Sequence, residues 1–475
     1  MEEAASGSPL FLGVREIRTV EEAAAYLERL INVEKQPGLP YERLGLEPVR
    51  ELLARLDDPH HQLPVIHVGG SKGKGSTVLF IESIARAAGL RVGAFTSPHL
   101  ERWTERFRIG GAEVPDDHLI AAVERLRPHV DALRTANPGA APTFFDATTA
   151  AAFLLFAEAR VDCAVIEVGL GGRLDSTNVV APVVTCVTSI ELEHTDTLGD
   201  NLAAIAREKA GILKPGVPVV AGLLPPPARV ALLERAKAIG TRIAWLGSDF
   251  DVEVCEAGST GLSLRWLDGP LVVDARVPVI GEHQAANAAM AAACIRRTRW
   301  LSDDEVGPVV ATGLAAAVLP GRVEILGRSP WRVVDSAHTN ASVQALVRAL
   351  GMLPHRSRHL VLSVSAGKDM ASMLRALLPG AASVTVTRAE PTRSLPPETL
   401  AAAVRTAAPN VSLRVVPDPR RAVAEARANL ASDDLLCATG SVYLAGIARR
   451  VLRQEDRPRP AAVGRRKTRA AHGDP

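Results

Sequence analysis

The stretch His67-Val68-Gly69-Gly70-Ser71-Lys72-Gly73-Lys74-Gly75-Ser76-Thr77 decides the fold of this chain. An apolar run, Leu63 to Ile66, leads into it, and a helical pattern, Val78 to Ala88, leads out. Glycines let the backbone curl so that several N–H groups point inward, the following helix adds its positive end, and a lysine reaches the terminal phosphates. The pattern predicts a nucleotide phosphate-binding loop formed by Gly70, Ser71, Lys72, Gly73, Lys74, Gly75 and Ser76. A flexible glycine turn without a ligand is the structural alternative.

Length and composition are those of a globular protein with two or three domains. The chain has 475 residues, 47% of them apolar, and no run approaches the ~18 consecutive apolar residues of a membrane span. Its five cysteines are far apart and mostly inside apolar runs, which indicates buried free thiols. The sequence begins Met1-Glu2-Glu3, with acids where a secretion signal carries basic residues, so we expect a cytoplasmic protein without a membrane partner.

The net charge of +2 is unevenly distributed. Residues 453–475 contain seven Lys or Arg against three Asp or Glu, which leaves the preceding body near −2. The body therefore gives no reason to expect nucleic-acid binding. We expect residues 453–475 to form a disordered, solvated basic tail, with a nucleic-acid or membrane contact as the alternative.

Apolar strand patterns alternate with helical patterns along most of the chain. Helical patterns at 20–31 and from Tyr41 through Leu56 precede the phosphate loop. After it, strands are predicted at 91–96, 161–168, 183–188, 217–221 and 241–245, and helices at 116–134, 147–159, 201–210 and 226–239. A second series of strands is predicted at 331–335, 360–364, 382–387, 411–415 and 435–439. Such alternation is typical of parallel sheets covered by helices on both faces.

We therefore predict an α/β protein with two domains. A P-loop-containing parallel-sheet domain spans residues 1–300 and includes an antiparallel appendage at 250–280 and a long helix at 283–298. A linker at 301–319 joins it to a smaller Rossmann-like α/β domain at 320–452, which the tail at 453–475 follows.

Polar residues follow several of the predicted strands, where open parallel sheets place their ligand sites. Glu167 could hold the magnesium ion that bridges nucleotide phosphates, or could bond turn amides. His194 is either a metal ligand or an ordinary loop residue. The helix dipole alone explains Lys209, in the last turn of a predicted helix. Asp335 and His338 suit a ribose or phosphate, or the start of a helix.

Taken together, these residues resemble the Mur ligase superfamily, and most closely the folylpolyglutamate synthase/dihydrofolate synthase family. The resemblance covers about residue 20 to residue 450. Besides the phosphate loop it is carried by Thr96-Ser97-Pro98-His99-Leu100, Glu105-Arg106-Phe107-Arg108-Ile109, the run from Glu167 to Asn178, Glu208-Lys209-Ala210-Gly211-Ile212, His283-Gln284 with Asn287-Ala288, Pro320-Gly321-Arg322-Val323-Glu324, and Gly440-Ser441-Val442-Tyr443-Leu444.

The resemblance implies roles for individual residues. Ser97, Glu167 and His194 correspond to magnesium ligands, and Lys74 and Ser76 to contacts with the nucleotide phosphates. Lys209 corresponds to a lysine that is carbamylated in this superfamily, which supplies an extra carboxylate for a second magnesium ion. Lys74, Lys209 and His194 are thus the implied catalytic residues. Asn287, Arg322, Asp335 and His338 correspond to contacts with adenosine and phosphate, the last three from the C-terminal domain.

The segment Thr143 to Thr149 resembles the pterin side of the family's site, with Asp146 where a glutamate is usual. Phe144 and Phe145 could stack on a flat pterin while Asp146 accepts its N–H donors. Two core aromatics before a helix capped by Asp146 are the structural alternative. Arg173, in the glycine-rich run after Glu167, is a further candidate for substrate binding.

Three motifs depart from the family pattern. Asp335-Ser336-Ala337-His338-Thr339-Asn340 replaces Asp-Gly-Ala-His-Asn-Pro, Glu191 and Glu193 flank His194 where Gly and Asp are typical, and Ala366-Gly367-Lys368-Asp369 stands for Asp-Lys-Asp. None of these changes removes a reactive group.

The resemblance implies an ATP-dependent amide ligase that adds L-glutamate to dihydropteroate and to the γ-carboxylate of reduced folates through an acyl phosphate, with ATP and two magnesium ions. A monofunctional folylpolyglutamate synthase and a ligase of cell-wall precursors are the alternatives. A regulatory GTPase is disfavoured because the sequence has no Asn-Lys-x-Asp run. We expect a monomer with small-molecule substrates and no nucleic-acid partner.

Overall fold

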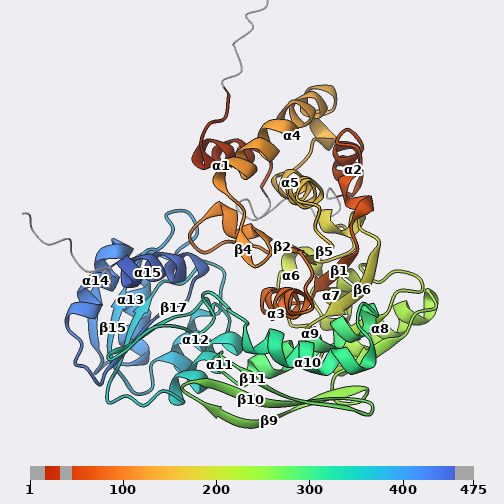
Figure 1. Cartoon of the computed structure of the whole chain (residues 1–475). Coiled ribbons are helices and arrows are strands. Elements are labelled where there is room, and N and C mark those ends of the chain that lie inside the picture. Colours follow the sequence, from red (N-terminus) through yellow and green to blue (C-terminus); the bar gives the residue numbers. More distant parts are fainter. Residues whose placement is uncertain (1–15, 33–44, 455–475) are drawn as a thin grey trace, which may run out of the picture.

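The computed structural model describes residues 16–32 and 45–454, which form two large sheets and one small one (Figure 1). The first sheet has eight strands in the order β4-β3-β2-β5-β1-β6-β7-β8. Strands β2, β5, β1, β6, β7 and β8 are parallel, and β3 and β4 continue the β2 edge antiparallel. The bounds are β1 Val65–Gly69, β2 Val92–Phe95, β3 Phe107–Ile109, β4 Ala112–Glu113, β5 Cys163–Glu167, β6 Pro182–Val187, β7 Val219–Ala221 and β8 Ile243–Trp245.

Helices cover both faces of this sheet because alternate residues of its central strands face opposite ways. Ile66 and Val68 of β1 belong to one core cluster, with α3 (Lys74–Ala87), α9 (His283–Thr298) and α10 (Asp303–Ala315). Val65 belongs to the opposite cluster, with α1 (Val20–Glu28), α2 (Glu47–Ala54), α4 (Asp116–Ala136) and α5 (Phe144–Glu158). Helices α6 (Thr195–Leu198), α7 (Leu202–Ala210) and α8 (Pro226–Ala238) complete the β7 end.

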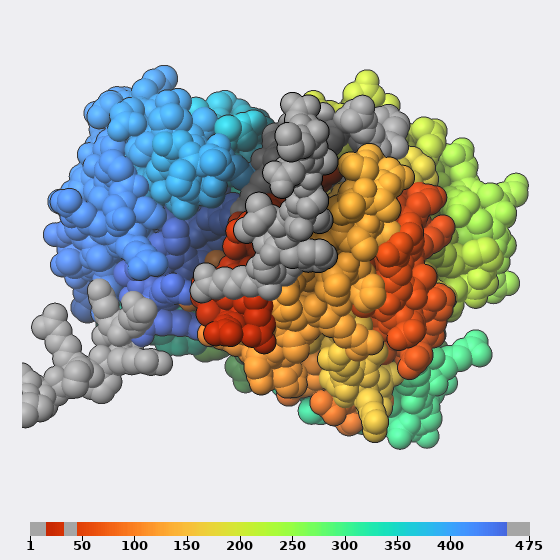
Figure 2. Space-filling model, turned by 90° about the horizontal axis from the view of Figure 1, so that it is seen from above, coloured from red at the N-terminus to blue at the C-terminus, as the bar shows by residue number. Residues whose placement is uncertain are grey.

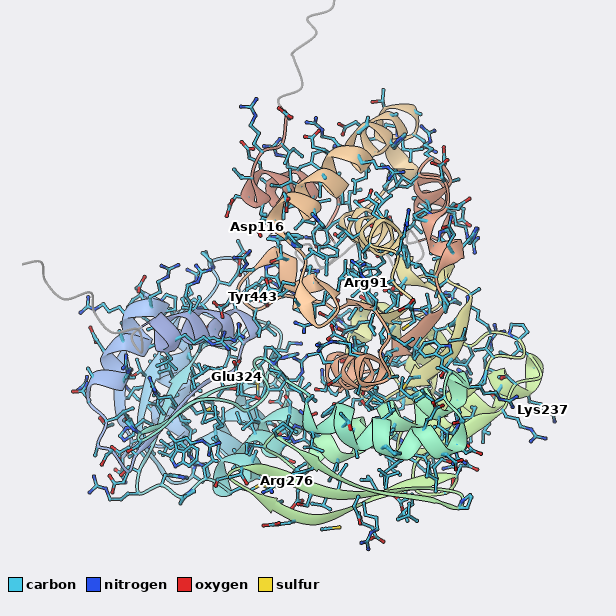
Figure 3. All side chains as sticks on the ribbon, viewed as in Figure 1. Arg91, Asp116, Lys237, Arg276, Glu324 and Tyr443 are labelled. Atoms are coloured by element: carbon cyan, nitrogen blue, oxygen red, sulfur yellow. The ribbon has the colours of Figure 1, made fainter. Side chains whose placement is uncertain are left out.

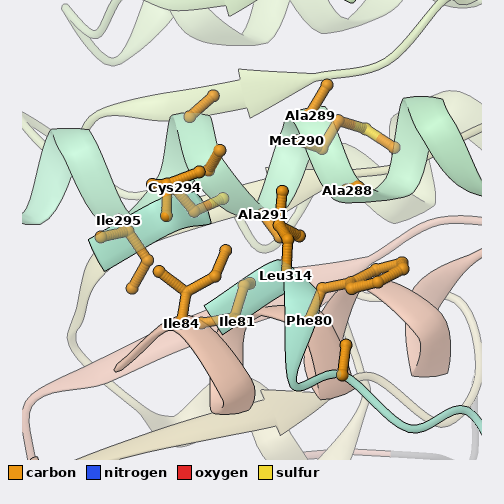
Figure 4. Packing of buried hydrophobic residues seen from close by; sticks show 14 of the residues in the cluster. Phe80, Ile81, Ile84, Ala288, Ala289, Met290, Ala291, Cys294, Ile295 and Leu314 are labelled. Atoms are coloured by element: carbon orange, nitrogen blue, oxygen red, sulfur yellow. The ribbon is translucent and has the colours of Figure 1, made fainter. Parts of the chain in front are cut away.

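The contact between α3 and α9 depends on small residues. Ala288 and Ala291 of α9 face Phe80, Ile81 and Ile84 of α3, and all of these side chains are buried (Figure 4). Because alanine adds little bulk, the two helix axes can approach closely while the larger side chains of α3 fill the space between them. This packing fixes the helix that begins at the phosphate loop.

A three-stranded antiparallel sheet lies against the outer side of α9 and α10 (Figure 1). It consists of β9 (Phe250–Gly258), β10 (Gly261–Asp268) and β11 (Leu271–Val277), with β10 in the centre. Leu262, Leu264 and Trp266 alternate along β10 and point into the shared core. The appendage predicted at 250–280 and the helix predicted at 283–298 are both confirmed.

The second large sheet has six strands in the order β12-β13-β17-β14-β15-β16, all parallel except β12. Its strands are β12 Glu324–Arg328, β13 Trp331–Val334, β14 Arg358–Leu362, β15 Ala381–Val386, β16 Ser412–Val415 and β17 Leu435–Thr439. Helices α11 (Asn340–Gly351), α12 (Met370–Leu377) and α13 (Pro397–Ala407) cover one face, and α14 (Pro419–Ala428) and α15 (Val442–Gln454) the other. Figure 2 shows this part of the chain as a separate blue lobe.

Two details differ from the sequence-based prediction. The segment 301–319 is not an open linker, because Asp303–Ala315 forms α10 and Val306, Val310 and Leu314 are buried in the core with α3. The edge strand β12 was not predicted, because Gly327 and Arg328 interrupt its apolar pattern. The predicted start of a helix at Tyr41 and residues 455–475 of the predicted tail lie outside the described residues.

Four of the five cysteines confirm the prediction of buried free thiols, and Cys255 contradicts it. Within the described ranges no disulfide is formed, and Cys163, Cys186, Cys294 and Cys437 are buried, whereas Cys255 is exposed. None of the helices in these ranges is long and apolar enough to cross a membrane.

Candidate active site

The phosphate loop joins the carboxyl end of β1 to the start of α3. Gly73 is the N-cap of α3 with φ 83°, a left-handed conformation that glycine adopts without strain. Lys74 opens the helix, and its Nζ folds back to donate to the carbonyl oxygens of Gly70 (3.1 Å) and Ser71 (3.5 Å). The N–H groups of a helix's first turn have no intrahelical partner, so this loop presents donors and a cation at one point.

The end of β6 holds the loop in place. Ser189 O accepts from the N–H of Ser71 (2.8 Å), and Ser189 Oγ accepts from the N–H of Lys72 (2.8 Å). Thr188 Oγ1 donates to Lys72 O at 2.6 Å, and Ser71 Oγ accepts from Glu191 N at 3.0 Å. These hydrogen bonds occupy the polar groups of Ser71 and Lys72 and fix the first part of the loop. The segment from Gly73 to Ser76 is then the part that can face a ligand.

Gly75 is the point at which the two halves of the chain meet. A Cβ on this glycine would collide with Nη2 of Arg322 and would lie 3.4 Å from Oε2 of Glu167. Arg322, from the segment before β12, thus reaches the phosphate loop. Asn287 of α9 approaches in the same way, since a Cβ on Gly73 would collide with its Oδ1. The structure brings four of the predicted site residues together here: Lys74, Glu167, Asn287 and Arg322.

Glu167 ends β5 with its carboxylate almost fully buried. Its Oε2 accepts a hydrogen bond from the Ser97 N–H at 3.1 Å, the only hydrogen bond to this carboxylate from residues 16–32 and 45–454. Burial raises the pKa of Glu167, and the cations of Lys74 and Arg322 act in the opposite direction. Most of the oxygen lone pairs of Glu167 therefore remain available to a cation or a solvent molecule.

Lys209, at the end of α7, is only 2% exposed and does not behave as a solvated helix-end cation. Its Nζ donates to Gly70 O (2.9 Å) and pairs with Glu193 Oε1 (3.1 Å). Burial lowers the pKa of Lys209 to about 8, the nearby Lys74 cation adds to that effect, and Glu193 opposes it. A neutral amine is thus accessible near pH 8 beside the phosphate loop.

Glu193 connects two of the lysines and was not predicted as a site residue. It pairs with Lys72 Nζ at 3.0 Å as well as with Lys209. Although burial alone would raise the pKa of Glu193, the cations of Lys209 and Lys72 lower it overall. The sequence signal was present in its position beside His194, but Lys209 is 16 residues away and its burial could not be read from the pattern.

His194 follows Glu193 directly and has a left-handed backbone conformation, with φ 49°. It is the N-cap residue of the short helix α6, and its side chain is exposed. No hydrogen bond within the described ranges joins it to Ser97 or Glu167. The structure therefore places Ser97 against Glu167, while His194 lies on the neighbouring loop after β6.

The C-terminal half contributes Arg322, Asp335, His338 and Lys368 at the edge facing the phosphate loop. Asp335 accepts from the N–H groups of Val323 (2.8 Å) and Ala337 (2.7 Å), so its carboxylate orders the loop that carries Arg322. His338 Nδ1 contacts Ser336 O at 2.9 Å. Burial lowers the pKa of Lys368, and the cation of Lys72 lowers it further, which places these two lysines within electrostatic reach across the interface.

The predicted pterin segment divides into two parts. Phe144 is buried, and the Arg106 guanidinium lies 5.5 Å from its ring centroid. Asp146 Oδ2 accepts from Thr143 N–H (2.8 Å) and Oγ–H (2.7 Å), and Oδ1 accepts from Ser176 Oγ (2.6 Å). Oδ2 of Asp146 therefore closes the capping box of α5, as the structural alternative stated, and Oδ1 is occupied by Ser176.

Phe145 differs from these two neighbours because it is only partly buried. Its ring lies on Gly169, directly after β5, since a Cβ on that glycine would collide with the ring. The ring is thus held near Glu167. Arg173 is farther out, with an exposed side chain that pairs with Glu208 (3.0 Å).

The chain is similar to known proteins along most of its length. The chain matches the models of the Mur ligase middle domain over residues 68–295 and of the Mur ligase glutamate ligase domain over residues 321–442. A Bacillus subtilis dihydrofolate synthase/folylpolyglutamate synthase is 36% identical over 70% of this chain and 78% of its own length.

This chain belongs to the folylpolyglutamate synthase/dihydrofolate synthase family. A solved member of the family, the Mycobacterium tuberculosis folylpolyglutamate synthase complexed with ADP and AMPPCP, has a TM-score of 0.82 and 32% identity over 92% of this chain and 99% of its own. A probable bifunctional folylpolyglutamate synthase/dihydropteroate synthase from Halobacterium salinarum is 36% identical over 90% of this chain. The chain spans about half (51%) of that relative's length.

Lys368 stands in Ala366-Gly367-Lys368-Asp369, where the family pattern is Asp-Lys-Asp. Burial lowers its pKa, and the charges of Lys72 and Glu193 act on it in opposite directions. The motif was recognised in the sequence, but the influence of these two residues could not be predicted because they lie in another part of the chain.

Proposed function

We propose that this chain is an ATP-dependent ligase that joins L-glutamate to dihydropteroate and to the γ-carboxylate of reduced folates. The observation that best supports this proposal is the contact of Arg322 with the phosphate loop at Gly75, beside Glu167. A nucleotide bound there would touch cationic groups from both halves of the chain. The names of the relatives support the choice of folate and glutamate as substrates.

The chemistry needs an activated acid, since a carboxylate is a poor acylating agent. ATP would phosphorylate the acceptor carboxylate to an acyl phosphate, the amine of glutamate would attack the acyl carbon, and phosphate would leave from the tetrahedral intermediate. In this scheme Lys74 and Arg322 offset the negative charge that moves with the phosphoryl group. Asn287 and His338 would orient the nucleotide.

The oxygen donors at the carboxyl ends of β2 and β5 fit magnesium. We assign Ser97 and Glu167 to hold it, because the Glu167 carboxylate accepts a single hydrogen bond among the described residues and Ser97 adds a second hard oxygen donor. His194, on the loop after β6, is assigned as a third ligand only on the family resemblance. When bound, magnesium neutralises the phosphate oxygens. We further propose that Lys209 carries a carbamate, because its amine is buried at a lowered pKa next to the phosphate loop.

We also propose two domains, with the first ending after α10 and the second beginning near Pro320. Closure between them would complete the ATP site and exclude water. The protein would act as a monomer in the cytoplasm, where ATP and glutamate are available.

The predicted pterin segment, Thr143 to Thr149, supports a bifunctional enzyme. Phe145 offers a partly exposed ring beside Gly169, on which a pterin could stack. A monofunctional folylpolyglutamate synthase is the second candidate, because Asp146, the predicted partner of the pterin N–H groups, is engaged in the cap of α5.

ADP release measured with dihydropteroate or tetrahydrofolate, each with and without glutamate, tests the proposal. We expect release with both acceptors, and only when glutamate is present. Turnover with tetrahydrofolate alone would leave the monofunctional candidate. Release that is indifferent to acceptor and amine would contradict ligase activity.

A further inference from the structure

A second group of chemically active side chains lies away from the phosphate loop. Asp58, His60 and His61 stand on and just before the 3-10 turn Pro59–Gln62, which precedes β1. One potential ligand atom from each lies within 4.8 Å of the other two, and no other trio of His, Cys, Asp or Glu in residues 16–32 and 45–454 meets this condition. The turn enters the amino end of β1, whereas the phosphate loop leaves its carboxyl end, so the two sites are separate.

His60 provides an independent sign that a ligand belongs here. Its side chain is 5% exposed, yet its Nδ1 has no hydrogen-bond partner among the described residues. A buried polar atom without a partner costs free energy, and native structures rarely leave one unsatisfied. The Nδ1 atom of His60 is therefore available to a ligand such as a metal ion.

The packing holds this imidazole in position. Its ring centroid lies 4.1 Å from that of His61 and 5.5 Å from that of Phe153 on α5. Asp58 has a left-handed backbone (φ 47°), and its N–H donates to Leu53 O at the end of α2 (2.9 Å). An ion bound to the three side chains would connect the end of α2 to the face of α5 just before the central strand of the large sheet.

We propose that Asp58, His60 and His61 bind a divalent transition-metal ion of the zinc class, with water completing the coordination. Two imidazoles and one carboxylate match the ligand preference of Zn²⁺, Co²⁺ or Ni²⁺, whereas Mg²⁺ prefers oxygen ligands. Since His60 is buried and the site lies at the opposite end of β1 from the phosphate loop, the ion stabilises the fold and takes no part in ligation.

The test uses the full chain after treatment with a chelator and desalting. Zn²⁺ affinity is measured by competition with a chromophoric chelator, and Co²⁺ absorption reports the geometry of the site. We expect one site per chain that is weakened at least ~10-fold in His61→Ala and in Asp58→Asn. Because His61 is exposed, its replacement should leave the fold intact, as circular dichroism would verify.

Two matched variants locate the ion. His118→Ala removes another exposed histidine, and His194→Ala removes the histidine assigned to the catalytic cleft; both should keep the zinc site. Added Zn²⁺ should raise the Tm of the wild type and of His118→Ala, and not that of His61→Ala. The proposal is overturned if the wild type binds no zinc, if His61→Ala binds it as tightly, or if only His194→Ala loses the site.

Discussion

At the scale of single residues, Lys74 has the clearest consequence. Its Nζ is held by the carbonyl oxygens of Gly70 and Ser71, where it would meet the terminal phosphates of ATP. We expect Lys74→Ala to lower the rate of glutamate ligation by about 10²- to 10³-fold, the usual loss when a group that stabilises transition-state charge is removed. ADP release under saturating acceptor and glutamate measures the effect.

The matched control for this variant is Lys237→Ala, an exposed lysine on α8 (Figure 3). It should ligate glutamate at the wild-type rate. Thermal unfolding of both variants shows whether the fold is kept. Near wild-type turnover by folded Lys74→Ala would mean that the phosphate loop has been misassigned.

Lys209 provides a second residue-scale prediction. Only the neutral amine reacts with CO₂, and with a pKa of about 8 the neutral fraction of Lys209 rises steeply as pH increases from 6 to 8. After depletion of CO₂, activity should therefore return with bicarbonate faster at pH 8 than at pH 6. Incorporation of ¹³CO₂, followed by NMR, should give a carbamate signal in the wild type that Lys209→Ala lacks.

Short-chain carboxylates provide the accompanying chemical rescue. Formate or acetate should restore part of the activity of Lys209→Ala, because either can replace the lost carbamate oxygens. The exposed Lys237 again serves as the control, since Lys237→Ala should give neither a loss nor a rescue. Activity that is independent of CO₂, bicarbonate and added carboxylates would leave Lys209 as the buried cation paired with Glu193.

At the scale of elements, the start of α5 depends on Asp146. Its carboxylate closes the capping box with Thr143 and accepts from Ser176, and it is 3% exposed. Asp146→Ala should therefore lower the free energy of unfolding by about 1–3 kcal/mol, since it removes a cap and leaves buried donors unpaired. Urea unfolding measures this, with the exposed Asp117→Ala on α4 as the control.

The same variant separates the structural role of Asp146 from a pterin contact. If the cap is its main role, dihydropteroate and tetrahydrofolate should lose turnover to a similar extent in Asp146→Ala, in step with its loss of stability. Phe145→Ala should lower turnover with these pterin-containing acceptors while the cap of α5 is kept. If Asp146→Ala remains stable and selectively loses turnover of dihydropteroate, the Asp146 carboxylate contacts the pterin after all.

The strands and helices could largely be predicted from the sequence, because their apolar periods are local. Helix α9 has its predicted bounds, and the strands of both parallel series were found within about two residues at most ends, as periodicity allows. Helix α10 was not predicted, because Gly307 and Pro308 are residues typical of a linker. Its apolar residues nevertheless pack against α3.

The candidate site was predictable only where a motif marks it. The phosphate loop, Glu167 and Arg322 stand in recognisable motifs, and the structure brings them together at Gly75. The pairing of Glu193 with both Lys72 and Lys209 could not be predicted, because it depends on the fold bringing two separate loops and the end of α7 together. For the same reason the engagement of Asp146 with Ser176, 30 residues away, could only remain an alternative.

At the scale of the whole molecule, ion pairs join the two halves near the candidate site. Arg449 of α15 pairs with Glu101, in the loop after β2, at 2.7 Å, and with Glu324 of β12 at 2.9 Å. All three side chains are at most 13% exposed. Figure 3 shows Glu324 where the C-terminal part faces the N-terminal part. Because Glu324 is only two residues after Arg322, this cluster positions the segment that reaches the phosphate loop.

Arg449→Ala should therefore weaken ATP binding, although Arg449 is not among the residues assigned to contact the nucleotide. Removing the cation leaves the negative charges of Glu101 and Glu324 less well neutralised. For a partly buried pair this disfavours the closed arrangement of the two halves by about 1–2 kcal/mol. The KM for ATP should therefore rise by about 5- to 30-fold. Arg450→Ala is the control, because Arg450 is 43% exposed and lies 3.6 Å from Glu101. Its effect on KM should be several-fold smaller.

A double variant tests whether Arg449 acts by holding the two halves together. In that case, Glu101→Gln combined with Arg449→Ala should raise the KM for ATP by less than the two single effects multiplied together. Strictly additive effects, or a fall in Tm with an unchanged KM, would show that the cluster stabilises the C-terminal sheet alone and does not assemble the ATP site.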